Sequence, residues 1–320
     1  MTPADSSAVP TLDEWLALSP AALAAIVRPR RPAVMLAIDG TRRHYLLAHP
    51  EQHGQLTDFA AYSAYSAAAY ARVYGLLFGL GIETIMTSFL YPPNFIRGGT
   101  YLPQALAASQ ALLMTGPLAD LYAQWQVRAR IYGDYDFAPA AAPVRGAIHE
   151  AAQALAAATP TGDRLLLIGY SAGSFVDEII VRSATLQATL GRVPTTAELR
   201  AACYPDGPEA LNIYIAAGCL RVALALPPLL DEGATDIYNL AHLPLDLQEE
   251  TMRRILYDHL FRRWAGGGDF QDYAPDDLAA LRTYYAAHRN CLVGLGQLAA
   301  GAFWYADHPH PPDVGPAGRS

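Results

Sequence analysis

The sequence has few cysteines, and none is placed for a disulfide framework or a structural zinc site. The 320 residues include only three, Cys203, Cys219 and Cys291. They lie far apart and form no C-x-x-C pair, whereas disulfide-rich secreted domains and zinc sites use more numerous, closely spaced cysteines. This pattern fits a reducing compartment, and we expect a cytoplasmic protein.

Charged residues are scarce, at 16% of the chain, and the formal net charge is −8. Nonspecific nucleic-acid binding needs clustered basic side chains that displace counterions, so we expect no nucleic-acid partner. No uninterrupted apolar run is long enough to span a bilayer, and the first residues lack the basic and apolar regions of a secretory signal. We therefore expect no signal peptide and no stable membrane insertion.

Hydrophobic residues, by contrast, make up 52% of the chain, which is enough for a sizeable core. Apolar strand-like runs alternate with segments of helical periodicity, and this predicts right-handed βαβ units in a doubly wound, mostly parallel sheet flanked by helices. We expect a single α/β domain over residues 1–320, with the Pro-, Gly- and Ser-rich ends, 1–10 and 307–320, mobile. The expected strands are 32–39, 82–91, 127–135, 164–173 and 210–218, and the expected helices are 11–27, 56–81, 102–126, 142–160, 174–191, 195–204, 244–268 and 275–288. Thr11 and Glu14 have the spacing of a capping box, and Gly116-Pro117 interrupts the third helical segment.

The first expected strand ends in IDGTRR, which places Asp39 and Gly40 before Thr41, Arg42 and Arg43. Ligands of a doubly wound sheet bind at the carboxyl ends of its strands. A helix N-terminus with two arginines suits an anion such as a diphosphate. Asp39 would repel the phosphates unless a Mg²⁺ ion lay between them, held by this carboxylate and the substrate's oxygens. The stretch indicates Mg²⁺-diphosphate chemistry; the alternative is a turn with a solvated basic pair.

IDGTRR resembles the D-G-x-x-R signature of the cis-prenyltransferases. It is more closely similar to the diterpene synthases of the tuberculosinol and kolavelool synthase group, which have the cis-prenyltransferase fold. Matching segments follow in order, namely GLGIETI, NFIRGG with Arg97, RIYGDY, MRRILYDHLFRRW and GLGQLAAGAFWYA, so the resemblance covers about Trp15 to Asp307. It implies a cis-prenyltransferase-like fold, Mg²⁺ as cofactor, an isoprenoid diphosphate as substrate, and a homodimer.

One departure from the family pattern concerns the second substrate. Chain-elongating cis-prenyltransferases carry R-x-x-x-x-x-R-x-S after the fifth strand, where it holds isopentenyl diphosphate. Here only Arg221 matches, while Ile215 and Ala223 stand at the positions of the first arginine and the serine. A site without those groups should hold a second diphosphate poorly, so a chain-elongating enzyme is an alternative only. A noncatalytic partner subunit is disfavoured because Asp39, Arg42 and Arg43 are all present.

The resemblance and this departure together predict a Mg²⁺-dependent diterpene synthase. It would ionise a bicyclic C20 allylic diphosphate of the halimane or clerodane type, such as kolavenyl or tuberculosinyl diphosphate. Water would then quench the cation to give a diterpene alcohol and diphosphate. Asp39 would bind the metal, with Asp236 as the implied second ligand. The diphosphate would contact Gly40, Thr41, Arg42, Arg43, Arg97 and Arg221.

The helix expected over 56–81 carries three tyrosines that would line a hydrocarbon tunnel. Tyr62 and Tyr65 share a helix face, and their rings could stabilise a cation while a hydroxyl positions water. Tyr62 also falls near a tyrosine that the resemblance implies is catalytic. We therefore assign catalysis to Asp39 and Tyr62, and the tunnel wall to Tyr65 and Tyr70. The competing interpretation of Tyr65 and Tyr70 is that they are packed core.

LLLIGYSAGS supports a different class, a serine esterase or lipase of the α/β-hydrolase type. The G-x-S-x-G spelling after a strand would make Ser171 a nucleophile, and Asp231, Asp236, His242 and His259 follow in the required order. No H-G-G-G-type oxyanion stretch occurs, however, and the hydrolase interpretation leaves IDGTRR unexplained. We expect Asp134, after the third strand, to cap a turn. The chain contains neither D-D-x-x-D nor D-x-D-D, which argues against helical terpene synthases and proton-initiated cyclases.

Overall fold

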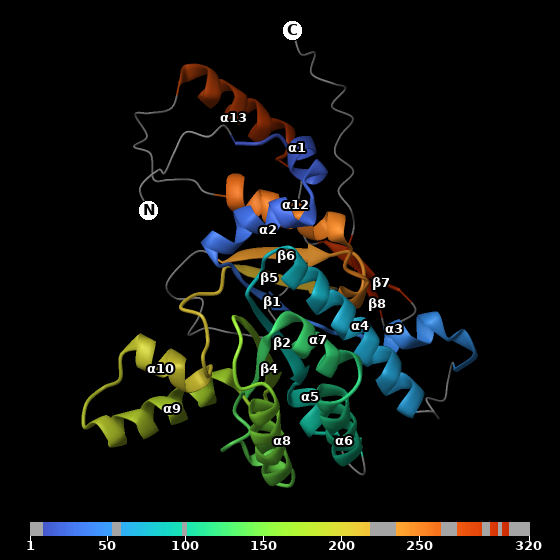
Figure 1. Ribbon diagram of the computed structural model, residues 1–320. Coiled ribbons are helices and arrows are strands. Elements are labelled where there is room, and N and C mark those ends of the chain that lie inside the picture. Colours follow the sequence, from blue (N-terminus) through green and yellow to red (C-terminus); the bar gives the residue numbers. More distant parts are fainter. Residues whose placement is uncertain are drawn as a thin grey trace.

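The computed structural model describes residues 9–52, 59–97, 101–217, 235–263, 274–289, 295–299 and 303–306. Its centre is a sheet made of β1 (Ala33–Leu36), β2 (Thr84–Leu90), β3 (Val127–Tyr132), β4 (Arg164–Tyr170), β5 (Ile213–Ala217) and β6 (Asp236–Leu240). These six strands are all parallel, in the order β3-β4-β2-β1-β5-β6 (Figure 1). The predicted fold class, a doubly wound parallel sheet flanked by helices, is confirmed. The expectation of mobile ends falls almost entirely outside the described residues.

The helices follow the predicted segments closely. Thr11 Oγ1 accepts a hydrogen bond from the Glu14 amide at 3.2 Å, and the Glu14 carboxylate accepts one from the Thr11 amide at 2.7 Å, so the capping box is present. The third helical segment is interrupted at Gly116 as predicted. The helices are α1 (Leu12–Ala17), α2 (Pro20–Val27), α3 (Thr41–Ala48), α4 (Phe59–Gly79), α5 (Pro92–Phe95), α6 (Tyr101–Met114), α7 (Pro117–Trp125), α8 (Arg145–Ala158), α9 (Phe175–Leu190), α10 (Thr196–Cys203), α12 (Glu249–Phe261) and α13 (Pro275–Ala287). Short 3-10 turns are η1 (Arg28–Arg30), η2 (Pro50–Gln52), η3 (Pro139–Ala141) and η4 (Pro244–Asp246).

Three strands were not predicted, and each has a reason. In β6, four of the five residues are partly or fully exposed, so DIYNL lacks the continuous apolar run of a buried parallel strand. The other two, β7 (Gly296–Ala299) and β8 (Phe303–Ala306), form a separate antiparallel hairpin within the segment GLGQLAAGAFWYA. Pattern arguments detect central strands more readily than edge strands and short hairpins, because only central strands are buried on both faces.

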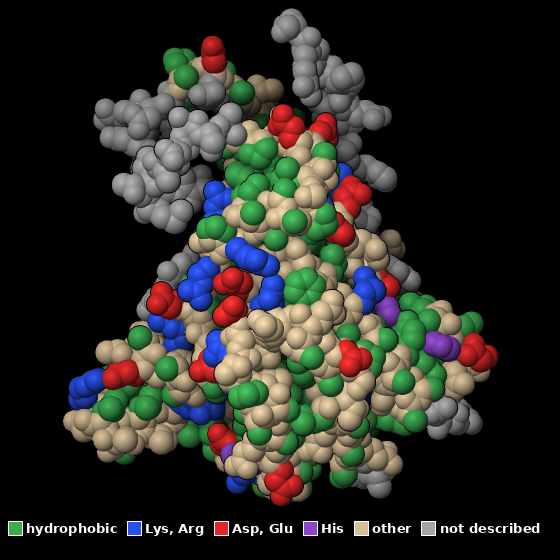
Figure 2. Space-filling model, in the orientation of Figure 1, with side chains coloured by type: hydrophobic (Ala, Val, Ile, Leu, Met, Phe, Trp, Pro, Cys, Tyr) green, Lys and Arg blue, Asp and Glu red, His purple; other side chains and the backbone are tan. Residues whose placement is uncertain are grey.

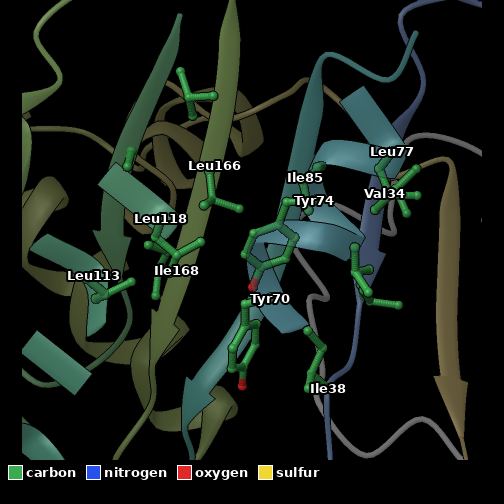
Figure 3. Close-up of a cluster of buried hydrophobic side chains, with 14 of the residues drawn as sticks. Val34, Ile38, Tyr70, Tyr74, Leu77, Ile85, Leu113, Leu118, Leu166 and Ile168 are labelled. Carbon is green, nitrogen blue, oxygen red and sulfur yellow. The ribbon is translucent and has the colours of Figure 1, made fainter. Parts of the chain in front are cut away.

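The core lies unequally on the two faces of the sheet. In β1, Val34 and Leu36 point into a large cluster covered by α1, α2, α4, α6, α7, α8 and α12. The alternate residues Ala33 and Met35 point into a smaller cluster that includes Cys203 of α10. Figure 3 shows Tyr70 and Tyr74 of α4 within the large cluster, against Ile85 of β2 and the aliphatic side chains of β4.

Two further observations concern the surface charges and the apolar character of the helices. Acidic and basic side chains are intermixed over the face seen in Figure 2. Among the described residues, no helix combines the length and the apolar character that a bilayer-crossing segment requires.

Candidate active site

The site lies at the carboxyl edge of the sheet, beside β1. The chain continues from β1 to β2 on one side, whereas β5 and β6 extend the sheet on the other side. Where strand order reverses in this way, a crevice opens beyond the carboxyl ends of the strands. Asp39 and Gly40 follow the last residue of β1 by three and four positions at that edge, and α3 begins at Thr41. The structure therefore places IDGTRR where a ligand of this fold would bind.

Asp39 presents an exposed carboxylate at the head of this loop. Its Oδ1 atom accepts hydrogen bonds from the Gly40 amide at 2.7 Å and from the Tyr91 hydroxyl at 3.3 Å. Among the described residues, no group of three or more His, Cys, Asp or Glu side chains could enclose a metal ion. A single carboxylate nevertheless suits Mg²⁺, which commonly takes one or two protein carboxylates and completes its shell with phosphate oxygens and water.

Gly40 caps α3 in a left-handed conformation, with φ at +82°. A Cβ atom built on it would lie 3.0 Å from Leu243 Cδ2 and 3.6 Å from the guanidinium carbon of Arg43. The loop after β6 therefore packs against the Asp39–Gly40 turn, and the Arg43 side chain folds back toward it. A side chain at position 40 would strain the backbone and would push Leu243 away from the turn.

Two further arginines gather on one aromatic ring. The guanidinium carbons of Arg42 and Arg97 lie 5.9 Å and 4.9 Å from the centroid of the Tyr101 ring. The Tyr101 hydroxyl accepts a hydrogen bond from Asn94 Nδ2 at 3.1 Å, and Asn94 Oδ1 accepts one from the Tyr91 amide at 3.1 Å. Two like charges held this close would be stabilised by a shared anion. Guanidinium groups suit a diphosphate because they donate two parallel hydrogen bonds.

Tyr62 reaches the same place from α4. Its hydroxyl shares a hydrogen bond of 2.8 Å with Thr41 Oγ1, the first residue of α3. Burial raises the pKa of the Tyr62 hydroxyl, and the hydrogen bond to Thr41 works in the opposite direction. The phenol therefore stays neutral near pH 7 and can donate a hydrogen bond.

Comparison with known proteins bears on the fold in which these residues lie. No family model matches the chain. The chain is 28% identical over 297 residues to tuberculosinyl adenosine transferase of Mycobacterium tuberculosis (strain CDC 1551 / Oshkosh), covering 92% of this chain and 97% of that protein. Its structure is similar to lavandulyl diphosphate synthase from Lavandula x intermedia, solved in complex with dimethylallyl diphosphate, with a TM-score of 0.57 and 16% identity over 74% of this chain and 98% of that one. It also resembles a probable undecaprenyl diphosphate synthase from Campylobacter jejuni, with a TM-score of 0.52 and 14% identity over 73% and 97%.

The chain has the cis-prenyltransferase fold. The resemblance inferred from IDGTRR is thereby confirmed, and the similar proteins are prenyl-transferring enzymes.

Within this cis-prenyltransferase fold, Tyr65 and Tyr70 have different surroundings. Tyr65 is partly exposed and packs outside the core, with ring centroids 5.3 Å from both His44 and Tyr45. Tyr70 is 5% exposed, and its ring packs at a tilt against that of Phe89, with centroids 5.1 Å apart. Tyr70 therefore belongs to the core, whereas Tyr65 lies between α3 and α4.

Tyr70 belongs to a series of neighbouring rings that we call the aromatic column, made of the buried Tyr70, Tyr74 and Tyr170 and the half-buried Phe89. The Tyr70 and Tyr74 centroids are 5.7 Å apart, and those of Phe89 and Tyr170 are 6.3 Å apart. Burial raises the pKa of Tyr70 well above its usual value, and the nearby phenols of Tyr74, Tyr62, Tyr170 and Tyr91 add to this. Two of these phenols contact the IDGTRR loop, because Tyr62 shares a hydrogen bond with Thr41 and Tyr91 donates one to Asp39.

Asp236 does not join Asp39 within this chain. It begins β6 in register with Ile213, the first residue of β5, so it lies at the amino edge of the sheet. There His259 Nδ1 lies 2.6 Å from its carboxylate. Asp39 follows the carboxyl end of β1, so the two carboxylates do not share one metal site in a single chain. Arg221, the remaining predicted diphosphate ligand, lies outside the described residues.

Three residues of the site escaped the sequence analysis. Tyr91, Asn94 and Tyr101 belong to the connection after β2, from which only Arg97 was selected. The available signal was their position, because they follow the carboxyl end of a central strand. Their roles depend on which side chains face Asp39 and the arginines, which spacing alone does not determine.

The G-x-S-x-G segment after β4 is explained by close packing. A Cβ on Gly169 would lie 2.8 Å from the Tyr132 hydroxyl oxygen, and one on Gly173 would lie 2.7 Å from Asp134 Oδ2. Asp134 is buried, and its carboxylate accepts a hydrogen bond from the Ala172 amide. Burial raises the pKa of Asp134, although hydrogen bonds from the Ala172 and Gly173 amides oppose the shift. Asp134 therefore caps the turn, as predicted.

The described part of the chain does not assemble a hydrolase triad around Ser171. His259 is paired with Asp236 at the amino edge of β6, while Ser171 follows the carboxyl end of β4, with β2, β1 and β5 between the two strands. His242 Nδ1 lies 2.9 Å from the carbonyl oxygen of Leu243, its neighbour. Asp231 lies outside the described residues.

Ser171→Ala is expected to leave diphosphate release within about threefold of the wild type, because the described residues place no histidine of a triad beside its hydroxyl. Steady-state assay of released diphosphate measures this. An inactive variant, together with ester hydrolysis by the wild type, would contradict the assignment and restore the hydrolase interpretation.

Gly173→Ala is expected to destabilise the fold by about 2 kcal/mol, since its methyl group would press on the Asp134 carboxylate that the turn amides hold in place. Urea denaturation measures the change. Gly146→Ala is the matched control: its Cβ would meet no heavy atom within 4 Å in α8, so it should be neutral or stabilising. An equal decrease in the free energy of unfolding in the two variants would show that the close approach of Asp134 is not the reason for a glycine at position 173.

Proposed function

We propose that this protein is a Mg²⁺-dependent diterpene synthase. It ionises a bicyclic C20 allylic diphosphate of the halimane or clerodane type, and water captures the cation to give a diterpene alcohol and diphosphate. The observation that carries the proposal is the grouping of Asp39 with Arg42 and Arg97, which both lie over Tyr101, at the N-terminus of α3.

In this proposal, the polar residues of the site bind the diphosphate end of the substrate, and the aromatic residues contact its hydrocarbon end. Arg42, Arg97 and the first amides of α3 bind the diphosphate and stabilise the charge it gains on leaving. Asp39 would hold Mg²⁺, and the ion would supply positive charge that offsets part of the charge on the leaving group. The Thr41–Tyr62 hydroxyl pair borders the bond that breaks, so either hydroxyl is placed to orient water.

The aromatic column suits the hydrocarbon end. Three of its four rings, those of Tyr70, Tyr74 and Tyr170, are buried, so they would exclude bulk water from an allylic cation. Their π-faces attract positive charge, by about 2 kcal/mol at desolvated sites. Tyr70 lies close enough to Tyr62 and Tyr91 to interact with both electrostatically, so in this proposal it would contact the cation or the atoms next to it.

A larger acceptor than water is the second candidate, because the relative with 28% identity is named as an adenosine transferase. The same ionisation would then end in transfer of the diterpenyl group to a nucleoside. Chain elongation has less support. Ile215, at the position of an arginine that binds the second diphosphate, is fully buried in β5 and offers no charge.

The test is incubation of the full chain and Mg²⁺ with linear and bicyclic C15 and C20 allylic diphosphates. Each would be tested alone, with adenosine, and with isopentenyl diphosphate. Mass spectrometry of products and an assay of released diphosphate give the result. Alcohol formed without an added acceptor supports the proposal, whereas an adduct formed only with adenosine identifies a transferase. A longer prenyl diphosphate identifies an elongating enzyme, and no release from any substrate contradicts the proposal. Light scattering on the same preparation tests the expected homodimer.

A further inference from the structure

His44 and Asp246 form a pair beside α3 that the mechanism above does not use. His44 Nε2 lies 3.0 Å from Asp246 Oδ1, although the two residues are 202 positions apart in the chain. The His44 side chain is 11% exposed and that of Asp246 is 50% exposed. Asp246 ends η4, in the loop between β6 and α12, so the fold brings a carboxylate from a distant segment onto the first turn of α3.

The second ring nitrogen of His44 faces the protein interior. A carboxylate oxygen only accepts, so the pairing with Asp246 places a proton on Nε2 and leaves Nδ1 of the neutral ring as an acceptor. Within the described part of the chain, Nδ1 is buried and has no hydrogen-bond partner. A buried acceptor without a donor costs about 1–3 kcal/mol. The arrangement would be favourable once a bound molecule supplied an O–H or N–H group.

His44 lies on the helix whose N-terminus forms the proposed substrate site. His44 follows Thr41 by one helical turn, and its ring packs on Tyr65 of α4 with centroids 5.3 Å apart. Leu243, in the same loop as Asp246, is the side chain closest to a Cβ built on Gly40. One loop thus covers both the diphosphate turn and His44.

The loop itself is anchored to α4. Arg72 donates hydrogen bonds to the carbonyl oxygens of Leu245 and Leu247, the second at 3.0 Å. These bonds hold the two neighbours of Asp246, so the carboxylate is positioned before any ligand binds. Preorganised support of this kind is typical of functional side chains, because a loosely held base is a poor one.

We propose that His44 Nδ1 accepts the proton of the nucleophile that captures the cation, and that Asp246 positions the ring and stabilises the imidazolium. The proposal rests on the proposed function. The C–O bond to the diphosphate breaks, and its electron pair leaves with the diphosphate. A lone pair of the water oxygen then forms the new C–O bond. The O–H bond breaks, its electrons remain on oxygen, and the proton moves to Nδ1, from which it passes to solvent. A histidine oriented by a carboxylate is a common general base.

His44→Gln tests the role of Nδ1, because glutamine can still donate to Asp246 but offers no acceptor at the Nδ1 position. Alcohol formation is expected to fall about 100-fold, in the range that general bases contribute. Diphosphate release should fall less, since the allylic cation would instead lose a proton to give a hydrocarbon. Asp246→Asn should change the product ratio in the same direction by about tenfold.

His149→Gln is the matched control. His149 Nε2 lies 3.0 Å from Asp136 Oδ1, so it forms an equivalent pair on a surface remote from α3. This variant should keep the wild-type product ratio, and thermal denaturation of all variants reports their folding.

The outcomes separate the two proposals. An unchanged product ratio in His44→Gln, or equal losses of alcohol and diphosphate release, would overturn the role of His44 while leaving the proposed function in place. A wild type that releases no diphosphate would contradict the proposed function itself. ¹⁵N NMR of the histidine-labelled wild type is independent of turnover. It should show the proton on Nε2 of His44 at neutral pH, and a shift of that proton toward Nδ1 in Asp246→Asn. A proton on Nδ1 in the wild type would overturn the proposal.

Discussion

Asp39→Asn is expected to lower diphosphate release by at least about 1,000-fold while the fold remains intact. The substitution keeps the shape and an oxygen for the Gly40 amide and the Tyr91 hydroxyl, and removes only the charge that would bind Mg²⁺. Without the metal, the leaving diphosphate would lose several kcal/mol of transition-state stabilisation, which corresponds to about three factors of ten in rate. Steady-state release of diphosphate, with circular dichroism as the check on folding, measures the effect.

Metal removal should have the same result as the substitution. EDTA is expected to stop diphosphate release by the wild type, and added Mg²⁺ should restore it, because one carboxylate cannot replace the missing charge. Asp120→Asn, which changes an exposed acidic residue in the first turn of α7, is the control and should remain fully active. Full activity of Asp39→Asn, or activity that EDTA does not affect, would exclude the metal-dependent mechanism.

Removal of the two arginines on Tyr101 is expected to weaken the diphosphate site severely. Arg42→Ala and Arg97→Ala should each lower kcat/KM by about 10- to 100-fold, since a hydrogen bond to a charged group contributes about 1.5–3 kcal/mol. In the double variant, the loss of transition-state stabilisation calculated from kcat/KM should be smaller than the sum of the two single losses. The reason is that both guanidinium groups lie over one ring and would share one anion. Kinetics on the four proteins of this double-mutant cycle measure the coupling.

The control for this cycle is Arg254→Ala. Arg254 is an exposed arginine of α12 whose guanidinium pairs with Glu250 at 2.8 Å, one helical turn away. Its removal should leave kcat/KM unchanged, since surface ion pairs contribute little. If Arg42→Ala and Arg97→Ala behaved like this control, the proposed diphosphate site would have to lie elsewhere.

The local chemistry of the main site was readable from the chain. IDGTRR combines a strand end, a glycine and two arginines within a few residues, and the right-handed βαβ rule places every such strand end at one edge of a parallel sheet. The break at Gly116 and the capping box at Thr11 were predictable for the same reason. Each depends on neighbours within one helical turn, and the geometry of such neighbours follows from covalent structure.

The spacing of the tyrosines was less informative. The spacing of Tyr65 and Tyr70 fits a helix that faces a tunnel. In the structure, however, Tyr65 packs against α3 and Tyr70 lies in the core. A helical repeat gives the angle between two side chains, whereas what stands opposite each of them depends on how α3 and the sheet pack against α4. LLLIGYSAGS shows the same limit. Its spelling is shared with the nucleophile elbow, but the partners of Ser171 would have to come from strands that the fold places elsewhere.

The sequence by itself therefore determined the class of fold and the sheet edge at which Asp39, Arg42 and Arg43 lie. Only the tertiary structure decided which distant side chains join them. It brought Tyr91 to Asp39, gathered Arg42 and Arg97 on Tyr101, and paired His44 with Asp246 across 202 residues. It also placed Asp236 at the opposite edge of the sheet. The physical reason is that short-range patterns specify each element, whereas strand order and the crossing of connections, set by burial of the whole core, determine which elements become neighbours.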